Sequence, residues 1–261
     1  MSELEFLRAL HVEMLRHDRI GFAESPHELF QTSTVQALVN GAFDGDVTLG
    51  ELLLHGDLGL GTLDGLDGEL IVVDGEAFKA ELDCTLTRPE KRTRTPYAVV
   101  VPFAPGRTLH IAGPTRARAL EARLWEGGEL PDRPQAIRID GTFARVSVRS
   151  VPRQSPPYPT LAEAIATQRV TQLRDIPGTM VGFCFPDGLA GIEILGSHLH
   201  FACHQRQRGG HVLDYTVRDA TVHLDSATGL HVELPPSVEP PRRGGWFDQT
   251  TLSRLERSDP D

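Results

Sequence analysis

Apolar residues recur at near-helical spacing through residues 1–18, which predicts an amphipathic helix at the N-terminus. A second apolar run spans residues 30–41 and ends at a glycine that suits the position just after a helix. Two threonines, each followed three residues later by a glutamate, form capping boxes. They predict a short helix over residues 48–54 and a longer one over residues 160–173. The pattern therefore places helical segments in both halves of the chain.

Between these helices the apolar residues come in short runs bounded by turn residues, which is typical of strands. The first run, Glu69–Val73, is followed by the turn pair Asp74-Gly75. Further strands are expected at Tyr97–Phe103, Ala136–Ile139 and Phe143–Val151. Helices that alternate with clusters of hairpins predict an α+β protein built around substantial sheet.

The proline-rich segment 152–159 is the best place for a domain boundary or a long connection. It divides the chain into an N-terminal part, 1–151, with helices and mixed sheet, and a C-terminal part, 152–261, with a helix and further sheet. Both parts place a capping box and a helix before a Gly-Thr pair and a strand, which favours two sheet-containing halves related by internal duplication. Chance explains the same pattern equally well, because capping boxes and Gly-Thr pairs are common.

The strongest chemical signal lies in the C-terminal part. His198 and His200 are two residues apart in an apolar, strand-like run, so their side chains point to the same face of a sheet. The polar residues 205–210 indicate a hairpin loop, and His211 opens the next alternating run. Such a hairpin brings three imidazoles together, a set that holds a divalent transition metal with positions left for substrate. We expect the two halves to pack around this metal site, which favours a metalloenzyme.

Composition narrows the partners and the compartment. The formal net charge of -10 argues against a nucleic-acid or anionic-membrane surface. No apolar run approaches the roughly 20 residues that a membrane span needs, and the acidic N-terminus does not look like an export signal. The three cysteines lack CxxC spacing and are too few for a disulfide framework. We therefore expect a cytoplasmic protein that binds neither nucleic acid nor membrane.

Several phrases along the chain, taken in order, resemble the alpha-acetolactate decarboxylase family over nearly the whole length. They are Phe30–Thr34, Leu53–Thr62, Leu66–Leu70, Ile139–Phe143, Arg149–Pro152, Gly196–Phe201 and Arg208–Asp214. The resemblance implies a zinc-dependent carboxy-lyase that converts (S)-2-acetolactate to (R)-acetoin and carbon dioxide. It also implies a fold of two sheet-containing halves.

The same resemblance implies a role for individual residues. It implies zinc binding by His198, His200 and His211, a glutamate near the metal at Glu69, a nearby threonine at Thr62 and an active-site arginine at Arg149. The family's C-terminal glutamate, also at the metal, matches Glu256 in the diverging tail. Glu239 is the fallback, although it sits among prolines.

Physical chemistry gives these residues work that fits the reaction. Decarboxylation of a β-keto acid builds up charge on the ketone oxygen, and zinc bound to the ketone and the neighbouring hydroxyl acts as a Lewis acid there. The enediolate that forms must take a proton on one face to give a single enantiomer, and Glu69 and Glu256 are both candidates to deliver it. Arg149 suits the substrate carboxylate and is better placed to orient it than to lower the barrier by charge, because the carboxylate leaves as neutral carbon dioxide.

Other interpretations remain open on the sequence alone. A cupin-like oxygenase or isomerase also carries an HxH pair on a sheet, and a non-catalytic metal-dependent ligand-binding module would keep the pocket without the chemistry. Arg149 could lie on a strand surface, Glu69 at a solvated turn, and Thr62 at an ordinary strand start. Ligand type does not separate zinc from other divalent ions. The expected partner is a small 2-hydroxy-3-keto acid, and a homodimer is the commonest assembly for such proteins.

Overall fold

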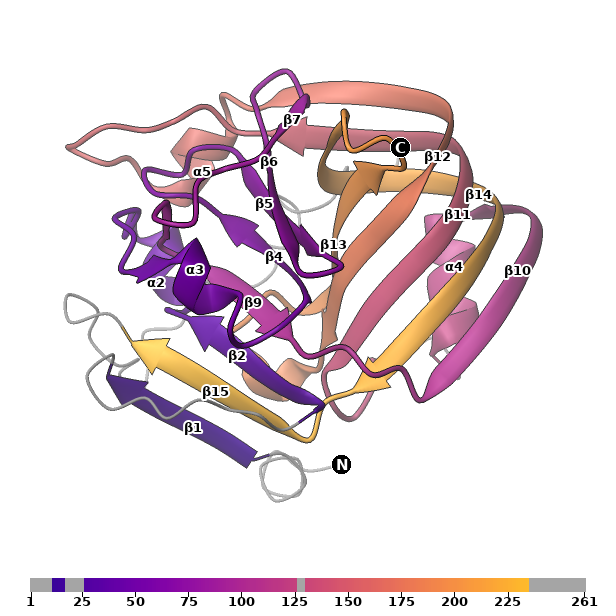
Figure 1. Ribbon diagram of the computed structural model, residues 1–261, viewed down its shortest axis with the longest axis horizontal. Coiled ribbons are helices and arrows are strands. Elements are labelled where there is room, and N and C mark those ends of the chain that lie inside the picture. The colour runs from indigo at the N-terminus through magenta and orange to yellow at the C-terminus, as the bar shows by residue number, and fades with distance from the viewer. Residues whose placement is uncertain (1–10, 17–25, 126–129, 235–261) are drawn as a thin grey trace.

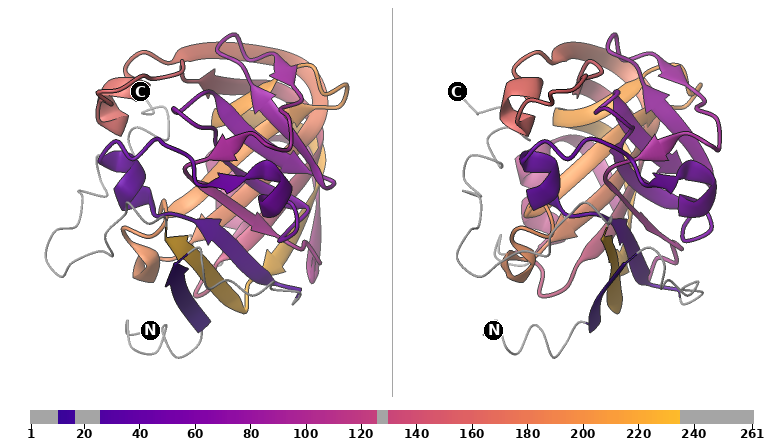
Figure 2. Two further views of the ribbon diagram at one scale, coloured as in Figure 1. Left: turned by 60° about the vertical axis from the view of Figure 1, so that its left-hand side comes forward. Right: turned by 90° about the vertical axis from the view of Figure 1, so that its left-hand side faces the viewer.

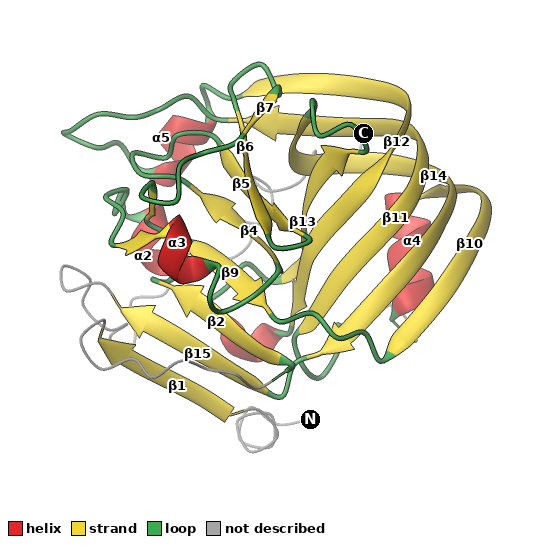
Figure 3. Ribbon diagram, in the orientation of Figure 1, coloured by secondary structure: helices red, strands yellow, loops and turns green. Residues whose placement is uncertain are grey.

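The computed structural model describes residues 11–16, 26–125 and 130–234 (Figure 1). Two sheets dominate this part of the chain, and the helices are few and short (Figure 3). The larger sheet has eight strands in the order β1-β15-β2-β9-β4-β5-β6-β7. Their bounds are His11–Arg16 (β1), Gly229–Leu234 (β15), Glu28–Thr32 (β2), Ala98–Val101 (β9), Leu58–Thr62 (β4), Glu69–Val73 (β5), Glu76–Ala80 (β6) and Leu86–Thr87 (β7).

The smaller sheet has five strands in the order β10-β14-β11-β12-β13. Their bounds are Arg107–Arg116 (β10), Gly209–Ser226 (β14), Gln135–Ser150 (β11), Arg169–Phe185 (β12) and Gly196–Cys203 (β13). Strand β14 pairs with β11 along its length and also with β13 at its start, so the sheet curls back on itself (Figure 1). A further two-stranded pair joins β3 (Val47–Thr48) to β8 (Arg94–Thr95).

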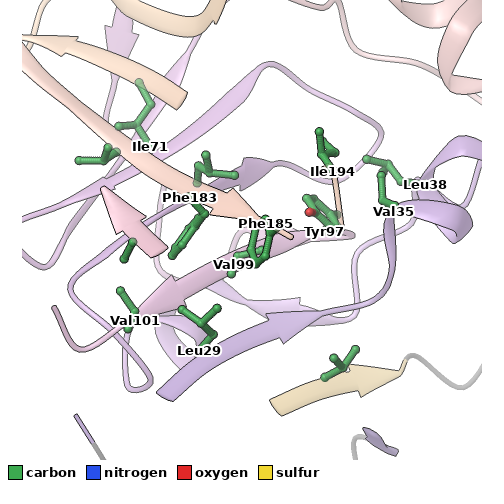
Figure 4. Close-up of a cluster of buried hydrophobic side chains, with 14 of the residues drawn as sticks. Leu29, Val35, Leu38, Ile71, Tyr97, Val99, Val101, Phe183, Phe185 and Ile194 are labelled. Atoms are coloured by element: carbon green, nitrogen blue, oxygen red, sulfur yellow. The ribbon is translucent and has the colours of Figure 1, made fainter. Parts of the chain in front are cut away.

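Three apolar clusters hold these layers together. The largest lies between the sheets, where Leu29 and Val99 of the larger sheet meet Phe183 and Phe185 of β12 (Figure 4). A second fills the inside of the curled sheet, where the Phe143 ring makes edge contacts with the rings of Phe201 and Tyr215. The third lies on the outer face of the larger sheet. Because opposite faces of a strand contribute to different clusters, the alternation of side chains fixes which residues face the space between the sheets. Figure 2 shows the backbones of the two sheets from two further directions.

The helices of the described part are α2 (Val35–Val39), α3 (Leu49–Leu52), α4 (Ala117–Leu124), α5 (Leu161–Ile165) and the 3-10 turn η3 (Asp187–Leu189). Both predicted capping boxes are present, with Thr48 and Thr160 each accepting from the backbone N–H of the following glutamate. Within the described ranges no helix is long and apolar enough to cross a membrane.

Two of the helices predicted from the sequence are shorter than expected. The helix over 48–54 ends at Leu52, and the helix over 160–173 ends at Ile165. Residues 169–173 instead begin strand β12 and pair with Val146–Ser150 of β11. Long-range strand pairing satisfies the backbone of this segment and outweighs its weak helical preference.

The predicted N-terminal helix over 1–18 is wrong where the structure describes it. Residues His11–Arg16 form β1, which pairs in parallel with β15 along the edge of the larger sheet. The remaining residues of that prediction lie outside the described ranges. The outer edge of β15 presents a row of backbone donors and acceptors, and pairing with β1 satisfies them.

The predicted strands at Ala136–Ile139 and Phe143–Val151 are one continuous strand, β11. Gly141, between them, lies against Asp219 and Ala220 of β14, and a Cβ there would come within 2.3 Å of the Asp219 carbonyl oxygen. The glycine therefore marks a close approach of two strands, where the sequence suggested a break.

The expectation of an α+β fold is met in part, because the described chain is mostly sheet with few helices. Each large sheet takes strands from both sides of residue 151: β15 joins the larger sheet, and β10 and β11 join the smaller one. The division at 151 and 152 thus does not separate the sheets, and it stays a prediction, as does the internal duplication.

Gly182 tests the register that places the histidine strand. A Cβ at Gly182 in β12 would lie 2.0 Å from the backbone oxygen of His198 in β13. Gly182→Ala should lower the free energy of unfolding by about 1–3 kcal/mol or more, because neither backbone can move without shifting its sheet. Denaturant unfolding measures this, with Gly106→Ala as control because nothing lies within 4 Å of its added Cβ. Equal stability of the two variants would contradict the register.

Candidate active site

The hairpin of β13 and β14 brings the three predicted histidines together. His198 and His200 point to the same face of β13, and His211 lies directly opposite His200 across the strand pair. All three side chains are buried, with at most 7 % of their surface exposed. They face the larger sheet, because their neighbours Leu199, Phe201 and Val212 fill the inside of the curl on the opposite face.

The imidazole nitrogens lie at the spacing of metal ligands. His198 Nε2 is 3.1 Å from His211 Nδ1, which is 3.3 Å from His200 Nε2. Tetrahedral zinc with bonds of about 2.0–2.1 Å has ligand atoms about 3.3–3.4 Å apart. The three ligand atoms all lie within 4.8 Å of one another and could hold a metal ion.

The orientation of His200 decides which of its nitrogens faces this centre. Its Nδ1 donates to the backbone oxygen of Leu70 in β5 at 2.7 Å, since a carbonyl oxygen can only accept. Neutral His200 therefore presents the lone pair of Nε2 to the other two rings. Burial, and then the neighbouring His198, hold the pKa of His200 well below its usual value, which keeps the ring neutral as a metal ligand must be.

The three ring nitrogens are arranged so that they could share one cation. Nδ1 of His211 lies close to both other nitrogens but carries at most one proton. With Nε2 of His200 acting as an acceptor, the three buried nitrogens lie around one point, where a shared divalent ion could bond to all of them.

The larger sheet supplies Glu69 and Thr62, and β11 supplies Arg149. Thr62 of β4 and Glu69 of β5 are paired across neighbouring strands, while Arg149 pairs with His211. The Glu69 carboxylate lies 3.7 Å from His200 Nε2 and 3.6 Å from Arg149 Nη1. Thr62 Oγ1 donates to the Gly68 backbone oxygen at 2.7 Å. A carboxylate, a guanidinium and three imidazoles thus share one buried place, although Glu69 and Arg149 are too far apart for a hydrogen bond.

These residues line a small cavity between the sheets. Its walls join the polar residues above to a set of mostly apolar ones: Leu38, Gly61, Leu66, Gly68, Tyr97, Val151, Leu161, Ile165 and Ile194. The structure therefore brings Thr62, Glu69, Arg149 and the three histidines to one cavity. Glu256 and its fallback Glu239 lie outside the described residues.

Sequence reasoning missed a second polar pair at this cavity. Tyr97 lines it, and the Tyr97 hydroxyl donates to Glu193 Oε2 at 2.5 Å. Glu193 has none of its surface exposed, and burial raises the pKa of its carboxyl to about 8 even though the hydrogen bonds from Tyr97 and the Ile194 N–H act to lower it. The signal was a lone glutamate in the apolar segment 189–195, which is uncommon unless the group is neutral or paired.

Comparison with known proteins shows the family of the chain. The family model for alpha-acetolactate decarboxylase matches residues 29–240. The alpha-acetolactate decarboxylase of Methylococcus capsulatus is 39% identical over 209 residues, covering 80% of each chain. That of Bacillus subtilis is 37% identical over 214 residues, covering 81% of this chain and 83% of the relative.

Solved structures show the same architecture. The crystal structure of alpha-acetolactate decarboxylase from Bacillus subtilis superposes with a TM-score of 0.76 at 36% identity, covering 81% of this chain and 90% of the other. A Staphylococcus aureus protein described as similar to alpha-acetolactate decarboxylase gives 0.78 at 31% identity, covering 87% of this chain and 97% of the other. The named relatives and the shared fold identify the chain as a carboxy-lyase. The chain belongs to the alpha-acetolactate decarboxylase family.

The raised pKa of Glu193 makes a prediction about stability and pH. The folded state holds a proton up to about pH 8 that the unfolded chain releases near its ordinary pKa of 4.5, so this group's contribution to stability falls as the pH rises between these values. Glu193→Gln cannot release a proton, so the free energy of unfolding of this variant should fall less steeply over the same range.

Denaturant unfolding at pH 5, 6, 7 and 8 measures the two slopes. Glu90→Gln is the matched control, because the Glu90 side chain is 67% exposed. The control should keep the wild-type slope. A Glu193→Gln slope equal to that of the wild type would show that Glu193 is already ionised at neutral pH.

Proposed function

We propose that this protein catalyses the zinc-dependent decarboxylation of (S)-2-acetolactate to (R)-acetoin and carbon dioxide. The observation that carries the proposal is the set of three imidazole nitrogens at 3.1 and 3.3 Å in a cavity that also holds a carboxylate and a guanidinium. The relatives named as alpha-acetolactate decarboxylases support the substrate.

The residues present fit a zinc ion, and His198, His200 and His211 would hold it through Nε2, Nε2 and Nδ1. When bound, zinc supplies a Lewis acid for the oxygen on which charge develops as the carbon–carbon bond breaks. Three protein ligands leave further positions for substrate, as in other catalytic zinc sites. His200 is held in this orientation by its hydrogen bond to Leu70 in the opposite sheet.

Arg149 binds the substrate carboxylate. Only 3% of Arg149 is exposed, and the residue lines the cavity next to Glu69. A planar guanidinium can form two parallel hydrogen bonds to a carboxylate, which fixes the direction of the bond to be broken. The negative charge leaves that group as carbon dioxide forms, so Arg149 orients the carboxylate and does not bind the transition state more tightly than the substrate.

Glu69 and Glu256 are the candidates for moving the proton that the product needs. Glu69 lies 3.7 Å from His200 Nε2, close enough for its carboxyl oxygens to reach a substrate held at the histidines. Delivery from one fixed carboxyl group to one face of the planar intermediate gives a single enantiomer of acetoin. Glu256 would add a second carboxyl group if the tail reaches the cavity, and Glu239 is the alternative. Thr62, tied to the Gly68 carbonyl, shapes the wall beside Glu69.

Incubation with racemic acetolactate tests the proposal directly. The purified protein loaded with zinc should convert half of the racemate rapidly to (R)-acetoin with release of one carbon dioxide per acetoin. The spontaneous rate without protein is the background. Acetoin formation no faster than this background, or consumption of oxygen in place of carbon dioxide release, would contradict it.

Two variants separate metal binding from substrate orientation. His198→Ala should lose zinc and activity together, because two imidazoles bind zinc much more weakly than three. Arg149→Ala should keep zinc but lose at least about 30-fold in kcat/KM, the equivalent of the roughly 2 kcal/mol lost when one partner of a buried charge pair is removed.

Metal analysis and steady-state kinetics measure both effects. His110→Ala is the control, because His110 is exposed on β10, bonds to Thr221 Oγ1 and does not line the cavity. It should keep both zinc and activity. A His198→Ala protein with wild-type turnover would end the proposal.

A further inference from the structure

Tyr97 lies in the wall of the cavity, and hydrogen bonds fix both its hydroxyl group and its backbone. Its hydroxyl donates to Glu193 Oε2 at 2.5 Å, and its backbone oxygen accepts from the Thr62 N–H and from Thr95 Oγ1, both at 3.0 Å. Only 2% of Tyr97 and none of Glu193 is exposed. The ring therefore cannot swing away from the cavity without breaking a buried hydrogen bond.

Tyr97 stands where two kinds of wall meet. The polar groups come from the strands that carry Glu69, Arg149 and the histidines, and Tyr97 is joined to that side through Thr62. Leu66 and Val151 lie beside the polar groups, whereas other apolar side chains come from the helices and from the segment before β13, among them Leu38 of α2, Ile165 of α5 and Ile194. Figure 4 shows Leu38, Ile194 and Tyr97 gathered at one end of the inter-sheet core.

The shape of the proposed substrate matches this division. A 2-hydroxy-2-alkyl-3-keto acid has a carboxylate for Arg149 and a hydroxyl and a ketone for the histidine centre. Only its alkyl groups remain for the apolar wall. Burial holds the pKa of Glu193 at about 8, so the Tyr97–Glu193 pair is neutral at pH 7 and does not repel the anionic substrate.

We propose that Tyr97, held in place by Glu193, is a specificity-determining residue that limits the length of the substrate's alkyl groups. The inference rests on the proposed function for the identity of the substrate. A tethered aromatic ring is a stiffer wall than the branched aliphatic side chains around it, so it excludes a longer chain more sharply. One methylene group in an apolar pocket changes selectivity by about 10–200-fold.

Replacement of the ring tests this inference. Tyr97→Leu removes both the ring and its hydrogen bond to Glu193, which we call the tether. It should raise the ratio of kcat/KM for the homologue with a propyl group in place of the 2-methyl group over kcat/KM for acetolactate by about tenfold or more. The change should appear mainly in KM, and zinc content should not change. Tyr97→Phe, which removes only the tether, should shift the ratio in the same direction but less, and it serves if Tyr97→Leu fails to fold.

Tyr158→Phe is the matched control. Tyr158 also donates its hydroxyl to a carboxylate, Asp44 at 2.7 Å, but does not line the cavity. This variant should keep the wild-type ratio of the two substrates.

Binding of unreactive analogues separates this inference from the proposed function. 2-Hydroxy-2-alkyl acids without the ketone cannot be decarboxylated, and calorimetry gives their Kd as the alkyl chain lengthens. Relaxed length dependence in Tyr97→Leu supports the inference even if the wild-type protein forms no acetoin, an outcome that would reject only the proposed function. If the folded, zinc-loaded variants keep the wild-type length dependence, or if no analogue binds the wild-type protein, the inference is wrong.

Discussion

The site depends on holding three imidazole nitrogens close to one another in the buried interior. Polar ring nitrogens gathered in a buried interior need a bonding partner there. The fold enforces the gathering with two constraints: the β13–β14 pairing sets His211 opposite His200, and the Leu70 carbonyl holds Nδ1 of His200. The first comes from one sheet and the second from the other, so the orientation of His200 at the centre depends on the packing of the two sheets.

Both sheets contribute to the site, and for this reason its residues come from distant parts of the chain. The curled sheet carries the histidines and Arg149, and the larger sheet carries Glu69 and Thr62. Apolar packing between the sheets, from residues such as Val99 and Phe183, fixes the distance between the two groups. The helices α2 and α5 add only aliphatic wall. The stability of the inter-sheet core and the geometry of the site are therefore one property of the molecule.

The sequence predicted the parts of this site that local patterns encode. The HxH spacing and the polar loop after it predicted the hairpin, because strand alternation and turn chemistry are short-range rules. The capping boxes at Thr48 and Thr160 were predicted correctly for the same reason. The resemblance to the family then singled out Thr62, Glu69 and Arg149, which no local pattern marks.

The predictions that were wrong concern segments whose structure is decided by contacts with distant parts of the chain. Residues 11–16 have helical periodicity but join a sheet edge, and residues 169–173 leave a predicted helix to pair with β11. No local pattern predicts that each sheet combines strands from before and after residue 151, because this too depends on long-range pairing. Tyr97 and Glu193 are 96 positions apart in the chain, so nothing local announces their hydrogen bond.

X-ray absorption spectroscopy of the zinc-loaded protein tests the central claim most directly. The account predicts one zinc ion per chain with three imidazole nitrogens at about 2.0–2.1 Å and oxygen in the remaining positions. A sulfur shell at about 2.3 Å, which would place the metal on a cysteine, or a spectrum with fewer than three imidazoles would contradict it.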